Sequence, residues 1–147
     1  CMNSDGANWK LLYMPGGGSR IPATEESVKN RDHFLKMNGK DVYKLAVKSL
    51  KTASVEAVER ANLKPEDIDL FIPHQANLRI IEAVRKRLDM PEEKVYINLE
   101  KYGNTSSASV PIALDEAIRA GRAKKGDIIL TAAFGAGFTW GATLFKL

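Results

Sequence analysis

The hydrophobic positions between Lys40 and Ala61 recur at the spacing of an amphipathic helix. Lysines occupy the other faces of this segment, so that one apolar stripe is left to face a core. The stripe consists of Val42, Leu45, Ala46, Leu50, Ala53 and Ala57. The pattern predicts one long helix that packs on a single side.

Short apolar runs predict the strands. IDLFIP at 68–73 follows a turn at LKPED and has the continuous apolar character of a strand buried on both faces. KVYIN at 94–98 and WKLLYM at 9–14 are expected to be two more strands. GDIILTAAF at 126–134 and FTWGATLFKL at 138–147 are expected to form a pair joined by the GAG turn.

Two further helices are expected between these strands. The first runs from about Gln75 to Leu88, and the second from about Thr105 to Ala120. The second has small residues in its early turns, which predicts close approach on several sides and burial. The order β, α, β, α, β, α, β, β with short connections predicts an α/β fold, a mixed sheet covered by helices.

Composition and charge limit the function classes. A chain of 147 residues with 44% hydrophobic character can form one compact domain. One cysteine allows no internal disulfide, and no apolar run has the length of a membrane span, so we expect a cytoplasmic protein without membrane contact. The net charge of +4 favours an acidic partner, but no nucleic-acid motif is present. Because the chain lacks a starting Met, it is expected to be a fragment.

Three motifs place polar groups where strands end: PHQAN at 73–77, YGNTSSAS at 102–109 and FGAGFTWG at 134–141. His74 and Asn104 each offer an N–H donor that can converge on one oxygen, and the glycine turn offers backbone N–H groups. Such donors suit an enolate and a tetrahedral oxyanion. The only cysteine, Cys1, lies outside every motif, so the nucleophile is expected to come from elsewhere.

The motifs PHQANLRII, YGNTSSASVPIALDEA and AAFGAGFTWGATL together resemble the C-terminal half of β-ketoacyl-acyl-carrier-protein synthase III. This condensing enzyme of the thiolase-like superfamily starts bacterial fatty-acid synthesis. The resemblance runs from about Phe34 to the end, and three motifs in order are a specific signal. It implies a five-layer αβαβα fold in which residues 1–147 are the C-terminal half. The N-terminal half, which carries the nucleophilic Cys, would be absent from the chain.

The resemblance also implies a mechanism. An acyl group passes from coenzyme A to the Cys, and malonyl on the acyl carrier protein then decarboxylates and attacks it; both thioesters are substrates, and no cofactor or metal is expected. By matching motif, His74 and Asn104 hold the enolate oxygen, and the amide of Ala136 completes the oxyanion hole. A neutral imidazole donates from one nitrogen only, so the other nitrogen of His74 should accept a hydrogen bond. Burial and the start of the following helix should both lower its pKa.

The resemblance further implies two groups of binding residues and a homodimer in the complete enzyme. Ordinary packing of two helix starts, or a solvated basic face, would explain the same residues without function. The positions expected to line the pantetheine channel are Gly39, Tyr43, Ala76, Asn77 and Ile80. Those expected to dock the carrier protein are Gln75, Ala76, Asn77, Leu78 and Arg79.

Other functions remain open. Asn104 could be a turn or cap residue, and FGAGFTWG a plain hairpin that lacks the spacing of a dinucleotide site. A degradative thiolase is disfavoured because the glycine turn lacks a cysteine. A polyketide-type synthase of the same fold ranks lower, and a carrier-protein-binding module without chemistry is the alternative from another class.

Overall fold

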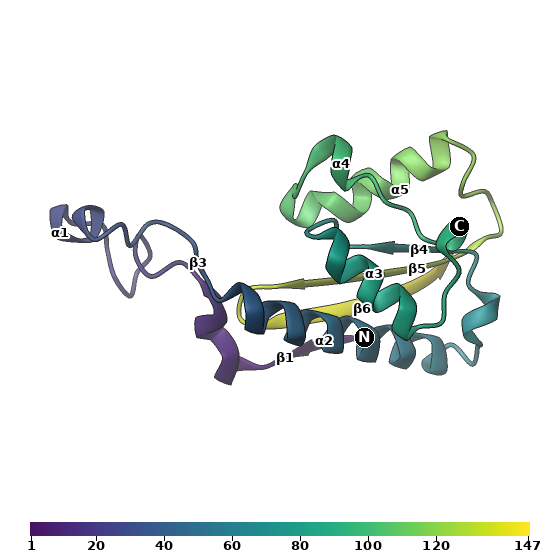
Figure 1. Ribbon diagram of the computed structural model, residues 1–147, viewed down its shortest axis with the longest axis horizontal. Coiled ribbons are helices and arrows are strands. Elements are labelled where there is room, and N and C mark those ends of the chain that lie inside the picture. The colour runs from purple at the N-terminus through teal and green to yellow at the C-terminus, as the bar shows by residue number, and fades with distance from the viewer.

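The computed structural model describes all 147 residues of the chain, and Figure 1 shows the arrangement of its elements. The strands are β1 (Met2–Ser4), β2 (Leu12–Tyr13), β3 (Lys36–Met37), β4 (Leu70–Pro73), β5 (Ile128–Gly135) and β6 (Thr139–Lys146). The α-helices are α1 (Glu25–Lys29), α2 (Gly39–Arg60), α3 (Leu78–Arg87), α4 (Leu99–Tyr102) and α5 (Ser109–Arg119). Short 3-10 turns lie at Gly6–Leu11, Pro65–Asp67, Glu92–Lys94 and Ser106–Ala108.

Four strands form the main sheet in the order β1-β6-β5-β4. β4 and β5 are parallel, whereas β6 is antiparallel to both β5 and β1, which confirms the predicted mixed sheet. The edge strand β1 was not predicted, because three residues carry too little pattern. Gly141 makes this pairing possible, since a side chain there would meet the Cys1 carbonyl oxygen at 2.7 Å.

One face of the sheet is covered by two helices. The apolar stripe of α2 packs on β5 and β6, and α3 packs beside α2. Phe71 from β4 and Leu130 from β5 point into this core, where both are almost fully buried. The long helix predicted for residues 40–61 is therefore confirmed.

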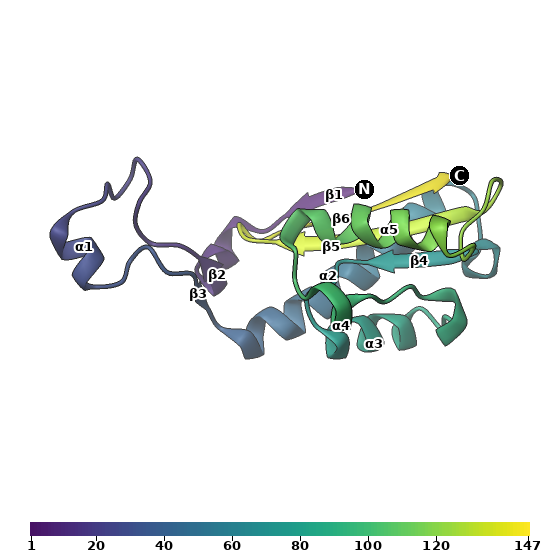
Figure 2. The same ribbon diagram turned by 90° about the horizontal axis from the view of Figure 1, so that it is seen from above.

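The other face is covered only in part. Ser109, Ala113 and Ala117 are the buried residues of α5, and the two alanines pack on Leu70, Ile72 and Ile129. Beyond α5 the sheet carries small side chains, and Ala133 and Thr143 are exposed. Figure 2 shows α5 on this side of the strands. The helix is therefore buried along one stripe, and the expected burial on several sides is wrong for this chain, since no further layer covers it.

Two predicted strands take another form. The segment 94–98 makes a single bridge, between Val95 and Phe71. The Tyr96 carbonyl and the Asn98 N–H, which a neighbouring strand would pair, bond instead to the side chain of Gln75. At 9–14, the first three residues belong to a 3-10 turn that Asp5 caps, and only Leu12 and Tyr13 form a strand.

The residues between β2 and β3 extend away from the body (Figure 1). This segment contains the short helix α1. Gly16 closes its base, because its N–H donates to the Asp32 carbonyl at 2.8 Å and a side chain would come within 2.9 Å of Asp32 Cβ. No helix of the chain is both long and apolar enough to cross a membrane.

Candidate active site

An open cavity of about 970 Å³ lies on the face of the sheet that α5 covers only in part. His74, which follows β4, lines it together with Phe134 of β5 and with Ser106 and Ser107. Because β4 and β5 are parallel, the residues that follow them meet at the same edge of the sheet. The motifs PHQAN and FGAGFTWG thus meet at one site because the strands before them are parallel. The third motif, YGNTSSAS, reaches the site through the turn before α5.

His74 is half-buried and held on two sides. Its backbone N–H donates to the Ala132 carbonyl at 2.8 Å, which continues the pairing of β4 with β5. Its Nδ1 lies 2.6 Å from Ser109 Oγ, and its ring meets Phe134 edge to face at 5.6 Å. Burial lowers the pKa of His74 from its ordinary value, which favours the neutral imidazole. One ring nitrogen of His74 therefore has a hydrogen-bond partner, the Ser109 hydroxyl, and the predicted acceptor role of that nitrogen depends on the tautomer.

Asn104 is exposed in the loop between α4 and α5. Its Oδ1 accepts a hydrogen bond from the Ser106 N–H at 2.9 Å. The oxygen end of the amide is thereby fixed, and Nδ2 makes no hydrogen bond within the chain. Asn104 does not line the cavity itself, but Ser106, which holds it, does. Asn104 thus holds the turn through Oδ1 and has Nδ2 available as a donor.

The turn between β5 and β6 carries Ala136. Its carbonyl accepts a hydrogen bond from Thr139 Oγ1 at 3.2 Å, whereas its N–H has no partner within the chain. Gly135 and Thr139 on either side of the turn line the cavity. The predicted pairing of these two strands around the glycine turn is confirmed, and Ala136 in the turn is exposed.

The helix predicted from about Gln75 begins later, at Leu78. Asn77 caps it, since its Oδ1 accepts from the Arg79 N–H at 2.9 Å. Gln75 and Ala76 form a turn before the cap, so His74 is four residues from the helix. Burial is the cause of the lowered pKa of His74, and the expected contribution of the helix end is not among its causes.

Gln75 is fully buried and ties three segments together. Its Nε2 donates to the carbonyls of Pro73 and Tyr96 at 2.8 and 3.2 Å, and its Oε1 accepts from the Asn98 N–H at 3.1 Å. Gln75 was expected to dock the carrier protein, but it is only 1% exposed. In the sequence, the one signal for a bracing role was a glutamine directly after the candidate histidine.

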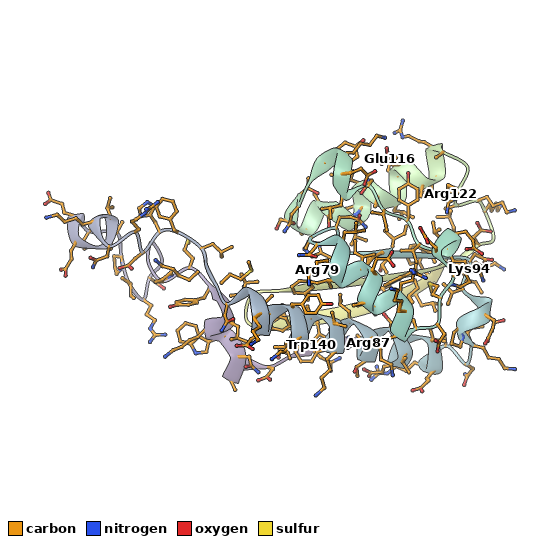
Figure 3. All side chains as sticks on the ribbon, viewed as in Figure 1. Arg79, Arg87, Lys94, Glu116, Arg122 and Trp140 are labelled. Atoms are coloured by element: carbon orange, nitrogen blue, oxygen red, sulfur yellow. The ribbon has the colours of Figure 1, made fainter.

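The bracing continues to α5. Asn98 Nδ2 donates to Glu116 Oε2 at 2.8 Å, and Lys101 pairs with the other carboxylate oxygen. Hydrogen bonds from Lys101 and then Asn98 hold the pKa of Glu116 below its usual value. Figure 3 shows Glu116 on α5, facing the segment that carries α4. The loop that follows β4 is therefore attached to α5 through Glu116 as well as through Ser109.

The remaining predicted binding residues lie at the first turns of α2 and α3. The Arg79 guanidinium lies 5.9 Å from the centre of the Tyr43 ring, which brings the two turns together. Gly39, Asn77 and Leu78 are exposed, and Ala76 is half-buried. Ile80 is 6% exposed and belongs to the main core, so it packs between the helices.

The basic residues of α3 differ in their surroundings. Arg79 and Arg87 lie near opposite ends of the helix (Figure 3), and both are exposed, as is Lys86. Arg85 is paired with Glu82 at 2.8 Å and donates to the Met90 carbonyl. Arg85 therefore belongs to the structure of the helix end.

Cys1 is distant from His74 across the sheet. It precedes β1, and β6 and β5 lie between β1 and β4. Three strand spacings separate these edges by roughly 14 Å. Cys1 is half-buried, and its backbone nitrogen donates to the Ala142 carbonyl at 2.8 Å. The chain also contains no cluster of three or more side chains that could hold a metal ion.

Comparison with known proteins agrees with these features. A model of the C-terminal part of 3-oxoacyl-[acyl-carrier-protein (ACP)] synthase III matches residues 58–147. The β-ketoacyl-[acyl-carrier-protein] synthase III of Caldanaerobacter subterraneus is 60% identical over 145 residues, which are 99% of this chain and 44% of that protein. The chain thus spans less than half the length of this relative.

Two solved structures extend the comparison. That of β-ketoacyl-[acyl-carrier-protein] synthase III from Thermus thermophilus has 46% identity and a TM-score of 0.86, with 100% of this chain and 44% of the other covered. A priming β-ketosynthase of a polyketide pathway has 36% identity and a TM-score of 0.84 over 99% of this chain and 43% of the other. The matched residues contain the His74 loop, the Asn104 loop and the glycine turn, and on this basis the chain belongs to the 3-oxoacyl-[acyl-carrier-protein] synthase III family, to whose C-terminal part it corresponds.

Proposed function

We propose that this chain supplies the enolate-binding wall of a condensing enzyme that joins an acyl-coenzyme A primer to malonyl-acyl-carrier protein. The observation that carries the proposal is the set of free donors at one edge of the sheet. Asn104 is fixed by its oxygen and keeps Nδ2 free, and the Ala136 N–H has no partner. His74, whose lowered pKa favours the neutral imidazole, lines the open cavity, as do Ser106 and Gly135 beside the other two donors. Preorganised donors of this kind stabilise negative charge that develops on a substrate oxygen.

The reaction begins outside the chain. A Cys thiolate of the preceding half takes the acyl group from coenzyme A and releases the coenzyme A thiol. The bond between the malonyl α-carbon and its carboxylate then breaks, carbon dioxide leaves, and the electron pair forms an enolate of the carrier-bound thioester. His74 and Asn104 donate to the enolate oxygen.

The enolate carbon next attacks the acyl carbonyl. The oxygen of that carbonyl becomes an oxyanion, to which the Ala136 N–H donates together with an N–H from the nucleophile's half. The tetrahedral intermediate collapses, the Cys thiolate leaves, and the product is a 3-oxoacyl thioester on the carrier protein. No metal or redox cofactor takes part in this sequence.

The open cavity is the surface on which we place the preceding half. The small residues of β5 and β6 there permit close approach of a further layer, as a five-layer αβαβα arrangement requires. Residues 1–147 then form the C-terminal domain, and the complete enzyme is a cytoplasmic homodimer.

The 147-residue chain alone should show neither acylation nor condensation, because Cys1 is separated from His74 by two strands. The complete protein should acylate its own Cys with acetyl-coenzyme A and form acetoacetyl-carrier protein. Mass spectrometry of the protein and of the carrier measures both steps. Acylation of Cys1 in the isolated chain at the rate of the complete protein would contradict the proposal, as would a complete protein that forms no condensation product.

We place the carrier protein at the first turn of α3, where Arg79 is exposed and contacts Tyr43. The docking and pantetheine-lining residues around it are Gly39, Tyr43, Gln75, Ala76, Asn77, Leu78 and Ile80, of which the buried Gln75 and Ile80 support the others. An acidic carrier would be attracted by Arg79 and Lys86 before its pantetheine arm enters.

Arg79→Glu in the complete protein should weaken use of malonyl-carrier protein about tenfold or more in kcat/KM while leaving acylation by small coenzyme A thioesters unchanged. The defect should shrink as salt is raised, because exposed charges are screened over about 8 Å at physiological ionic strength. Lys125→Glu, an equal charge change in the loop before β5, is the control. Equal losses with both substrates, insensitive to salt, would assign Arg79 to the fold instead.

A priming synthase of a polyketide pathway is the second candidate, and the likeness to such a structure favours it over other classes. The two candidates use the same chemistry on different primers. Offering acetyl and longer acyl-coenzyme A primers to the complete protein separates them by the ratio of their kcat/KM values.

A further inference from the structure

Ser109, the first residue of α5, lies between two partners. It is 2% exposed, and its Oγ is 2.6 Å from His74 Nδ1 and 3.2 Å from the Gln75 backbone nitrogen. A backbone N–H can only donate, so Oγ accepts the hydrogen bond from Gln75. The serine hydroxyl has one hydrogen left to place.

The position of that hydrogen follows from the other groups nearby. Ser109 Oγ has no further acceptor within reach in the chain besides His74 Nδ1. If Nδ1 carried the proton and donated to Oγ, the hydroxyl hydrogen would be buried without a partner, which is costly. All groups are satisfied only when the hydroxyl donates to Nδ1.

We propose that Ser109 is a positioning residue, whose hydroxyl donates to His74 Nδ1 and thereby keeps the proton on Nε2 as a donor into the cavity. The role of Ser109 rests on the proposed function in one respect: its effect on the rate is expected only if His74 donates to the enolate. The distances around Ser109 Oγ are sufficient to determine the tautomer. The Nε2–H of His74 would then donate to the anionic oxygen of a thioester enolate.

The rigidity of the neighbourhood gives the hydroxyl its direction. Gln75, whose N–H fixes Ser109 Oγ, is itself held by the Pro73 and Tyr96 carbonyls and the Asn98 N–H. Asn98 in turn bonds to Glu116, seven residues beyond Ser109 on the same helix. The helix is attached at two points two turns apart, so α5 cannot turn about its axis and carry Ser109 away from His74 without breaking the second attachment.

The test is the tautomer of His74 in the complete protein that contains this chain, labelled with ¹⁵N at histidine. Signals are assigned by their loss in His74→Asn. The parent should show an unprotonated, hydrogen-bonded Nδ1 and a protonated Nε2, whereas Ser109→Ala should populate both tautomers. The control Ser54→Ala removes another buried serine, on α2, whose hydroxyl has no partner, and should retain the parent's pattern. A protonated Nδ1 in the parent, or an unchanged pattern in Ser109→Ala, would overturn the proposal.

A kinetic measurement separates this inference from the proposed function. Ser109→Ala should slow malonyl decarboxylation about twofold if the two tautomers become equally populated and up to about tenfold, the equivalent of one hydrogen bond, if the Nδ1-protonated tautomer dominates, and it should leave acylation of the nucleophile unchanged. Slower decarboxylation with an unchanged tautomer would reject the positioning role. A changed tautomer with full decarboxylation would uphold it and reject His74 as the enolate donor.

A second variant covers the case in which Ser109→Ala fails to fold, because the Gln75 N–H would lose its acceptor. Ser109→Thr retains the hydroxyl and should keep the parent's tautomer. A Thr variant that populates both tautomers while folded would count against the proposal. The spectrum of the parent remains decisive by itself.

Discussion

Replacing His74 or Asn104 by alanine in the complete protein should slow decarboxylation of malonyl-carrier protein by about a hundred- to a thousandfold. Each replacement removes one preorganised donor from a developing oxyanion, and losses of this size are typical for such donors. Acylation of the nucleophile precedes enolate formation and should change much less. The measurement is the release of carbon dioxide by the acylated protein, beside the rate of acylation itself.

The control for this experiment is the second histidine. His33 is exposed in the segment between β2 and β3, so His33→Ala should retain both rates. Normal decarboxylation by His74→Ala or Asn104→Ala would remove that residue from the mechanism. An equal loss in acylation and decarboxylation would assign the residue to the structure of the site.

Replacing Gln75 by alanine should lower the free energy of unfolding by about 3–5 kcal/mol. Three buried backbone groups, the Pro73 and Tyr96 carbonyls and the Asn98 N–H, would lose their partner. An unsatisfied buried group costs about 1–3 kcal/mol, and the vacated volume adds a cavity cost. Denaturant unfolding measures the loss, and hydrogen exchange at the Asn98 amide shows where it occurs.

Gln75→Met separates hydrogen bonding from packing, since methionine has a similar volume but no amide. It should recover the cavity cost and leave most of the loss in place, with fast exchange at Asn98. A Met variant as stable as the parent would mean that the side-chain hydrogen bonds add no net stability.

Local patterns predicted the elements that carry their own signal. The stripe of α2, the apolar run of β4 and the hairpin of β5 and β6 were found because each buries one recognisable face or run. His74, Asn104 and Ala136 could be named as candidate donors because they lie in motifs that follow strands or precede a helix, and their role stays a prediction. The segment 94–98 was mispredicted because a side chain, Gln75, makes the hydrogen bonds that a strand would have made.

The sequence by itself determined an α/β chain with a mixed sheet and the three motifs by which it resembles its family, none of which contains a cysteine. These follow from periodicity and from residue type, which are local. The tertiary structure decided that Ser109 and Gln75 hold the His74 loop, that α5 covers only part of one sheet face, and that Cys1 lies across the sheet from His74. These are contacts between residues distant in sequence, and they depend on strand order and helix placement, which no local pattern encodes.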